Sequence, residues 1–275
     1  MKNPLLRKIA QLSLIGFALT GFVSCQSTME GVSLASAGMQ ETSRVAKSYA
    51  VDRPGLGTKL GGERYSSVTS TTFYRKSLGS PDAVDSFHYN DEKGAIAMLG
   101  GDKSATQRHS GRFNLANNTL SVALVGGYDD DAFPWMTSKS APGRTVVVGT
   151  AGSTYEISIE NKTKKRVEVV ASVDGLDVLD GGAASVKKHG HILEPGQRMA
   201  ISGLRKNSNQ VRAFTFGTVS ESAAAKKGEA AARNVGVIGL AVWQEDEAAA
   251  KQAAQLEANR RSEANPFGGS PVSLR

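Results

Sequence analysis

The pattern of apolar and polar positions predicts a β-rich domain in the middle of the chain. Between residues 65 and 243, short stretches rich in β-branched and aromatic residues are separated by turn-forming Gly, Pro, Asn and Asp. Short strands with frequent turns favour an antiparallel sandwich over a parallel sheet. The predicted strands cover residues 65–74, 86–89, 118–125, 144–148, 154–160, 166–173, 191–193, 198–203, 210–217 and 235–243.

The clearest alternation lies in the second half of this region. Residues 154–160 alternate apolar and polar side chains, and residues 166–173 follow after a polar turn, which predicts a hairpin with one buried face. Residues 191–203 predict a second strand, turn and strand around Glu194–Gln197. Residues 235–243 are apolar on both faces, so we expect a central strand there.

Two segments predict helices. Residues 244–264 carry Glu245 and Glu247 near the start and Arg260 and Arg261 near the end, which suits the helix dipole. The alanine-rich residues 220–233 predict a short helix that Gly228 interrupts.

The expected fold is therefore mainly β: an antiparallel β-sandwich, Ig-like or jelly-roll-like, with a C-terminal helix and flexible termini. We expect the sandwich to span residues 53–243 as one domain. A division into two modules, 53–150 and 151–243, is the alternative that the pattern leaves open. Residues 265–275, which hold two prolines and two glycines, predict a disordered tail.

The start of the chain has the pattern of an export signal. Three basic residues, Lys2, Arg7 and Lys8, precede an apolar stretch that runs from Ile9 to Val23. A membrane-spanning helix needs about 20 largely apolar residues. This stretch is shorter and contains polar positions, so we expect residues 1–24 to be a signal peptide.

The apolar stretch ends in Phe22-Val23-Ser24-Cys25, which resembles the lipobox of bacterial lipoproteins. That resemblance implies cleavage before Cys25, a diacylglycerol on its thiol, and anchoring in a membrane of the cell envelope. Gln26, where Asp often retains such proteins in the inner membrane, favours the outer membrane. Residues 25–52, rich in Ser, Gly and Ala, would then be a tether. An ordinary signal peptide with an incidental cysteine is the alternative.

Charge and cysteine content narrow the expected partners. Loss of the three basic residues of the signal lowers the formal charge of the chain from +7 to +4. The remaining basic residues are scattered and form no stripe interleaved with aromatics, which argues against a nucleic-acid partner. Cys25 is the single cysteine of the chain, so once lipidated it leaves no disulfide to stabilise the domain.

Two groups of residues are candidate metal ligands. Asp174, Asp177 and Asp180 place three carboxylates in one loop, and calcium prefers oxygen ligands, although the spacing differs from that of an EF-hand. Turn formation by the same aspartates is the alternative. His189 and His191 would share a face of a strand, a geometry that zinc uses, or would be two half-exposed side chains at the start of a strand.

A third group is a candidate ligand-binding surface. Asp129, Asp130 and Asp131 precede Phe133 and Trp135, and an acidic loop beside exposed aromatic rings can bind sugars. The alternatives are a solvated acidic loop and aromatic side chains that close the edge of the sandwich.

Catalytic motifs are missing from the sequence. No G-x-S-x-G motif is present, and the glycine-rich stretches lack the Gly-Lys-Ser/Thr of a phosphate loop. Residues 172–176 and 234–239 resemble uncharacterised exported bacterial proteins, a resemblance that implies no activity. We expect a non-enzymatic envelope lipoprotein, without a cofactor, that binds another envelope protein or a surface polymer. A lipid-anchored hydrolase of glycan or peptidoglycan and a calcium-dependent adhesive module are the alternatives.

Overall fold

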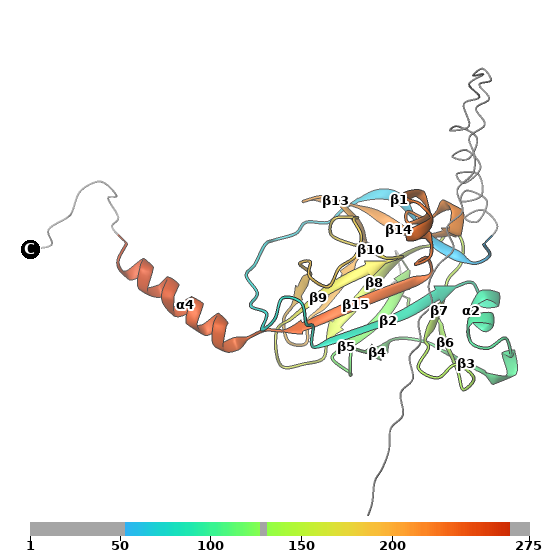
Figure 1. The fold of residues 1–275 in the computed structure, drawn as a ribbon, viewed down its shortest axis with the longest axis horizontal. Coiled ribbons are helices and arrows are strands. Elements are labelled where there is room, and N and C mark those ends of the chain that lie inside the picture. The colour runs from blue at the N-terminus through green and yellow to red at the C-terminus, as the bar shows by residue number, and fades with distance from the viewer. Residues whose placement is uncertain (1–52, 127–130, 265–275) are drawn as a thin grey trace, which may run out of the picture. The chain divides into compact units, whose positions relative to one another are not determined.

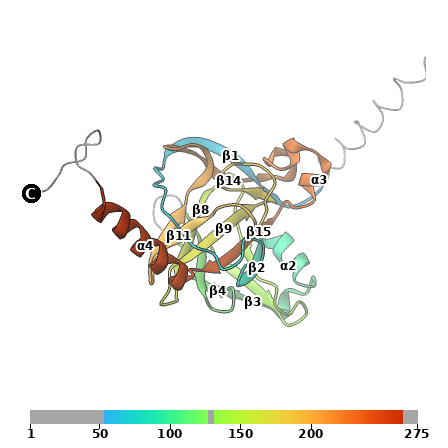
Figure 2. The ribbon, with the colours of Figure 1, turned by 60° about the vertical axis from the view of Figure 1, so that its left-hand side comes forward.

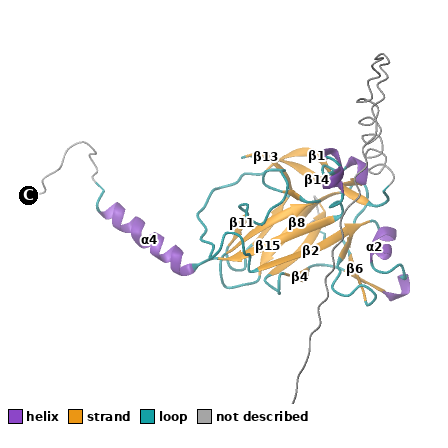
Figure 3. Ribbon diagram, in the orientation of Figure 1, coloured by secondary structure: helices purple, strands orange, loops and turns teal. Residues whose placement is uncertain are grey.

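The protein is a β-sandwich with short helices, as shown by a computed structural model that describes residues 53–126 and 131–264 (Figures 1 and 3). Two sheets pack face to face, and the apolar sides of their strands form the core. The prediction of a mainly β sandwich is confirmed.

The first sheet has seven strands, all of them antiparallel to their neighbours. Its order is β1, β14, β8, β5, β4; β12 pairs with β8, and β13 pairs with β14. The strands are β1 (Leu56–Tyr65), β4 (Phe113–Leu115), β5 (Leu120–Gly126), β8 (Thr154–Asn161), β12 (Arg198–Ile201), β13 (Gly203–Asn207) and β14 (Gln210–Thr218).

The second sheet has eight strands in the order β10, β9, β15, β2, β7, β6, β3, with β11 beside β9. All pairs are antiparallel except β2 and β7, which are parallel. The strands are β2 (Ala83–Asn90), β3 (Thr106–His109), β6 (Trp135–Ser138), β7 (Val146–Val148), β9 (Val167–Val173), β10 (Leu176–Asp177), β11 (His191–Leu193) and β15 (Val237–Gln244).

Helical segments are short apart from one at the C-terminal end. They are α2 (Glu92–Met98), α3 (Glu229–Ala232), α4 (Glu247–Ser262) and the 3-10 turns η1 (Lys103–Ala105), η2 (Val219–Glu221) and η3 (Ala225–Lys227). The break predicted at Gly228 is present, because this glycine has φ +117° between η3 and α3. Both ribbon views place the segment of η2, η3 and α3 beside the ends of β1 and β14 (Figures 1 and 2).

Aromatic rings fill the middle of the core. Tyr155 stacks on Phe216 with ring centroids 4.4 Å apart and on Phe214 at 5.3 Å. Such pairs add about 0.5–1.5 kcal/mol each to the free energy gained from burial of their apolar area.

Both halves of the chain contribute strands to both sheets, since β1 pairs with β14 and β2 pairs with β15. Residues 53–150 and 151–243 thus build one sandwich.

The predicted hairpin over residues 154–173 is wrong. β8 lies in the first sheet and β9 in the second, so the turn between them crosses from one sheet to the other. The second predicted pair, β11 and β12, crosses back in the same way. Alternation identified the buried face of β8, but β9 is buried on both faces, because Phe73 and Val186 pack on its outer side. Two strands that face one core from opposite sheets have the same alternation as a hairpin.

The Asn161 side chain forms hydrogen bonds to both of these connections between the sheets. Its side chain is completely buried, and its Nδ2 donates to the carbonyls of Lys165, Leu193 and Glu194 at 2.7–3.2 Å. Its Oδ1 accepts from the backbone N and the Oγ1 of Thr163. One amide therefore satisfies carbonyls of both connections, which a simple hairpin turn would not bring together.

The predicted strand over residues 65–74 is also wrong, because the strand lies upstream as β1 and ends at Tyr65. β1 is difficult to recognise from the sequence because it contains Gly57, Gly61 and Gly62, and glycine is depleted in strands. The next residues form a long irregular segment, 66–82, drawn as a loop in Figure 3. We call it the strap, because it packs on the outer face of the second sheet.

Several other strands agree with the sequence, whereas β3, β4, β6, β10 and most of β13 were not predicted. β2, β5, β7, β14 and β15 fall within or next to their predicted ranges, and β15 is central, between β9 and β2. The C-terminal helix is confirmed as α4, which begins with an Asp246 cap and buries none of its residues.

Candidate functional site

The most concentrated polar chemistry in the described chain surrounds Asp174, at the turn between β9 and β10. Asp174 is 1% exposed and adopts the left-handed conformation, with φ 55°. The following Gly175 is also left-handed, so an Asp-Gly pair forms the tight turn that ends β9. This turn points the carboxylate inward between the sheets instead of toward solvent.

Three donors surround the carboxylate. Oδ1 accepts from the Tyr89 hydroxyl at 2.6 Å and from the backbone N of Gly236 at 2.9 Å. Oδ2 accepts from the backbone N of Thr58 at 2.9 Å. The donors come from β2, from the residue before β15 and from β1, so the carboxylate ties strands of both sheets. We call this group of residues the Asp174 joint.

The hydrogen bonding continues into the core through two more hydroxyls. Thr58 Oγ1 lies 2.7 Å from the Tyr89 hydroxyl and 2.6 Å from the Tyr155 hydroxyl. All three side chains are buried. A chain of hydroxyls thus runs from Tyr155 in β8 through Thr58 in β1 and Tyr89 in β2 to Asp174.

Burial is the largest influence on the pKa values of these groups. It raises the pKa of Asp174 from 3.8 to about 6, although the hydrogen bonds from Tyr89, Thr58 and Gly236 favour the ionised carboxylate. Burial, together with the Asp174 charge, also raises the pKa of the Tyr89 and Tyr155 hydroxyls well above their ordinary value. At neutral pH the carboxylate is therefore ionised and both phenols are protonated.

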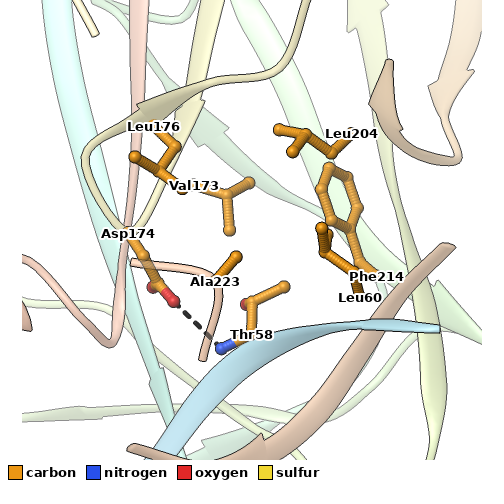
Figure 4. A pocket seen from close by; sticks show the side chains of 8 residues that line it. All are labelled: Thr58, Leu60, Val173, Asp174, Leu176, Leu204, Phe214 and Ala223. Carbon is orange, nitrogen blue, oxygen red and sulfur yellow. Dashed lines mark hydrogen bonds between the residues drawn. The ribbon is translucent and has the colours of Figure 1, made fainter. Parts of the chain in front are cut away.

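A small cavity lies beside the carboxylate (Figure 4). Its volume is about 10 Å³, enough for about one water molecule. The figure shows Asp174 and Thr58 as its polar side, facing an otherwise apolar wall. The lining residues are Thr58, Leu60, Val173, Asp174, Leu176, Leu204, Phe214 and Ala223. A cavity of this size does not admit a substrate or a cofactor.

The three aspartates of the proposed calcium loop have separate partners. Asp174 belongs to the joint, while buried Asp177 accepts through Oδ1 from the backbone N of Leu179 and of Asp180. The Asp180 carboxylate pairs with Lys188 at 2.7 Å. Desolvation raises the pKa of Asp177, and the hydrogen bond from Lys188 lowers that of Asp180. The geometry corresponds to the turn-forming alternative.

The two histidines do not share a face. β11 begins only at His191, and Gly190 before it packs against the Val169 backbone while its N donates to Glu168. The His189 side chain is exposed, whereas His191 Nε2 is buried without a partner among the described residues. Burial, with a smaller effect of the Arg205 charge, lowers the pKa of His191 to about 4, so this imidazole is neutral at neutral pH.

Trp135 of the proposed sugar-binding surface packs inward. Its ring stacks on His109 with centroids 4.1 Å apart and lies 5.3 Å from Phe113, which belongs to the core. Its Nε1 is buried with no partner in the described residues. Asp131 is exposed, whereas Asp129 and Asp130 lie outside the described residues. The position of Trp135 corresponds to the alternative in which it closes the edge of the sandwich.

The strap contains a buried ion pair that sequence analysis did not identify. Arg75 Nε donates to Glu168 at 2.6 Å, and both side chains are almost completely buried. The Arg75 guanidinium also lies over the Trp243 ring, 3.8 Å from its centroid. Arg75 and Glu168 are 93 residues apart in the sequence, so no local sequence pattern relates them.

Comparisons with known proteins do not identify a family, since the chain matches no family model, no curated protein and no solved structure. Within residues 53–126 and 131–264, no three His, Cys, Asp or Glu side chains are grouped as metal ligands would be. In the same ranges, no helix combines the length and apolar character needed to cross a membrane. Cys25 and the lipobox lie outside the described residues.

Proposed function

We propose that this chain is an envelope lipoprotein, anchored through a lipid on Cys25, that presents a rigid β-sandwich as a non-enzymatic binding domain. The observation that carries the proposal is the leader: three basic residues, a short apolar stretch, and the single cysteine placed directly after Ser24. Two or more acyl chains on one cysteine give stable membrane attachment, because each buried methylene contributes about 0.8 kcal/mol.

The chemistry of the domain supports a binding role over catalysis. Its most perturbed carboxylate, Asp174, is sealed between the sheets and hydrogen-bonded to protein groups. A catalytic acid or base must come within hydrogen-bond reach of a substrate. The cavity beside Asp174 has room for about one water molecule, so a substrate does not reach it. We therefore place the partner, another envelope protein or a surface polymer, on the outside of the sandwich.

The anchoring half of the proposal is tested by expressing the full chain in a bacterium supplied with a labelled fatty acid. We expect the wild-type protein to carry the label, to begin at Cys25 after processing, and to fractionate with membranes. Cys25→Ser should lose the label, because its hydroxyl cannot form the thioether, and should not begin at residue 25. Ser27→Ala, two residues away, is the matched control and should behave as wild type. A Cys25→Ser protein that still carries the label would refute lipid anchoring at this residue.

The binding half is tested by crosslinking in intact cells, with an affinity tag after Arg275. A partner recovered with wild-type protein and lost with Cys25→Ser supports an anchored binding domain. Turnover of a glycan or peptide substrate that one point substitution abolishes would instead show an enzyme, and would overturn the proposal.

A further inference from the structure

Three hydrogen bonds, here called links, join Tyr155, Thr58, Tyr89 and Asp174 in a row. When Asp174 is ionised, the three hydroxyl groups supply one hydrogen for each link. An ionised carboxylate only accepts hydrogen bonds, so the Tyr89 hydroxyl donates to it. The Tyr89 oxygen must then accept from Thr58, and the Thr58 oxygen from Tyr155. Three hydroxyl hydrogens fill three links, and every link points toward the carboxylate.

A proton added to Asp174 from solvent changes this count. Four hydrogens then share three links, so one of them needs an acceptor outside the chain. The cavity lined by Asp174 and Thr58 has room for about one water molecule, which could accept a carboxyl hydrogen pointing into it. The joint therefore has two proton states, one charged with all links filled and one neutral with an altered hydrogen direction.

We propose that Asp174 makes the sandwich a proton-responsive domain, in which proton uptake at mildly acidic pH stabilises the folded state by removing a buried charge. The charged state is costly because the carboxylate is buried, faces a largely apolar cavity wall, and forms no ion pair within the part of the chain that the structure describes. The titratable groups that face it are Tyr89 from β2 and Tyr155 from β8, and both are neutral. None of the other residues lining the cavity carries a charge. The proposal goes beyond the lipid anchor and does not depend on it.

The direction of the pH effect follows from linkage. The folded pKa of Asp174, about 6, lies above its ordinary value of 3.8, so the folded state holds this proton more tightly than the unfolded chain does. Stability from Asp174 is fully present below pH 3.8 and is lost as the pH rises to about 6. The unfolding equilibrium constant should increase on the order of a hundredfold across this window.

Several other carboxylates have the opposite pH dependence, and Asp177, whose pKa burial raises, has the same one, so the effect of Asp174 must be isolated by difference. Hydrogen bonds from Arg198, Lys188 and the Thr218 backbone lower the pKa of Glu160, Asp180 and Glu221, whose stabilisation is lost on acidification. The test is urea unfolding of the full chain in non-ionic detergent, followed by tryptophan fluorescence from pH 4 to pH 8, for wild type and Asp174→Asn.

Asp174→Asn should be less stable than wild type, because its amide NH₂ must face a donor, either Thr58 N or Gly236 N. Its neutral side chain cannot titrate, so the wild-type advantage should shrink as the pH rises from 4 to 7. An advantage that is constant over that range would overturn the proposal.

A second pair of variants decides the question even if Asp174→Asn does not fold. Tyr89→Phe removes a donor to the ionised carboxylate, so the pH midpoint of the effect should move upward. Tyr155→Phe makes the same chemical change one link further along the hydroxyl chain and leaves all donors to Asp174 in place, so its midpoint should match wild type. Equal midpoints for the two variants would contradict control by Asp174.

Discussion

Asn161 satisfies the carbonyls of two chain connections that cross between the sheets in opposite directions. Its amide is buried, and its Nδ2 is the side-chain donor to the carbonyls of Lys165, Leu193 and Glu194. A side chain without this NH₂ group would leave these three hydrogen bonds unmade. A buried polar group left without a partner costs about 1–3 kcal/mol. Both crossings should therefore depend on this one residue.

We predict that Asn161→Asp lowers the free energy of unfolding by about 3 kcal/mol or more at pH 7, because a carboxylate would face three carbonyls without a hydrogen to donate. Urea unfolding measures the change. Asn207→Asp, at an exposed position, should cost less than about 0.5 kcal/mol. Similar losses in the two variants would show that the buried amide does not hold the crossings.

Among elements, the strap is held to the second sheet by few but well-buried contacts. Besides the Arg75–Glu168 pair, Trp243 Nε1 donates to the Ser77 carbonyl at 3.1 Å, and Phe73 packs with Val170 and Trp243. Arg75 also donates to the Lys188 carbonyl at 2.6 Å. One guanidinium of the strap thus serves an ion pair, a carbonyl and an aromatic face.

We predict that Arg75→Met destabilises the protein by about 3–5 kcal/mol, since it leaves Glu168 buried without its cation. Limited proteolysis should then cut within residues 66–82 under conditions in which the wild-type strap is protected. Arg198→Met, which breaks the exposed pair with Glu160, is the control and should cost less than about 1 kcal/mol. A strap that stays protected in Arg75→Met would mean that apolar packing alone retains it.

The C-terminal helix α4 is predicted to be independent of the sandwich in stability. It buries no residue, and its one large apolar side chain, Leu256, is 53% exposed. Ala253→Gly with Ala254→Gly should remove helical circular dichroism, because each glycine costs about 1 kcal/mol in a helix. The melting temperature of the sandwich should not change, and a clear decrease would show that α4 packs on the domain.

For the molecule as a whole, sequence pattern predicted which side chains enter the core better than it predicted strand partners. Period-2 alternation identified the buried face of β8 but not the burial of both faces of β9. Alternation is also the same whether two strands share a sheet or face each other across the core. The long-range contacts of Asn161 and Arg75 could therefore not be predicted from the sequence pattern. For Asp174, the Asp-Gly turn was visible, whereas its donors come from Thr58, Tyr89 and Gly236, which lie 62–116 residues away in sequence.

Pairing between the two ends of the domain also determines when the protein can fold. Lys59 in β1 meets Glu221 across a separation of 162 residues, and Arg53 donates to the Ala232 carbonyl 179 residues away. High contact order of this kind slows folding to the range of milliseconds to seconds. A chain that emerges from a ribosome or a translocation pore with its N-terminus first has no sheet partner for β1 until β14 has also emerged. The first sheet therefore cannot form strand by strand as the chain emerges, and β1 joins it only once β14 is available.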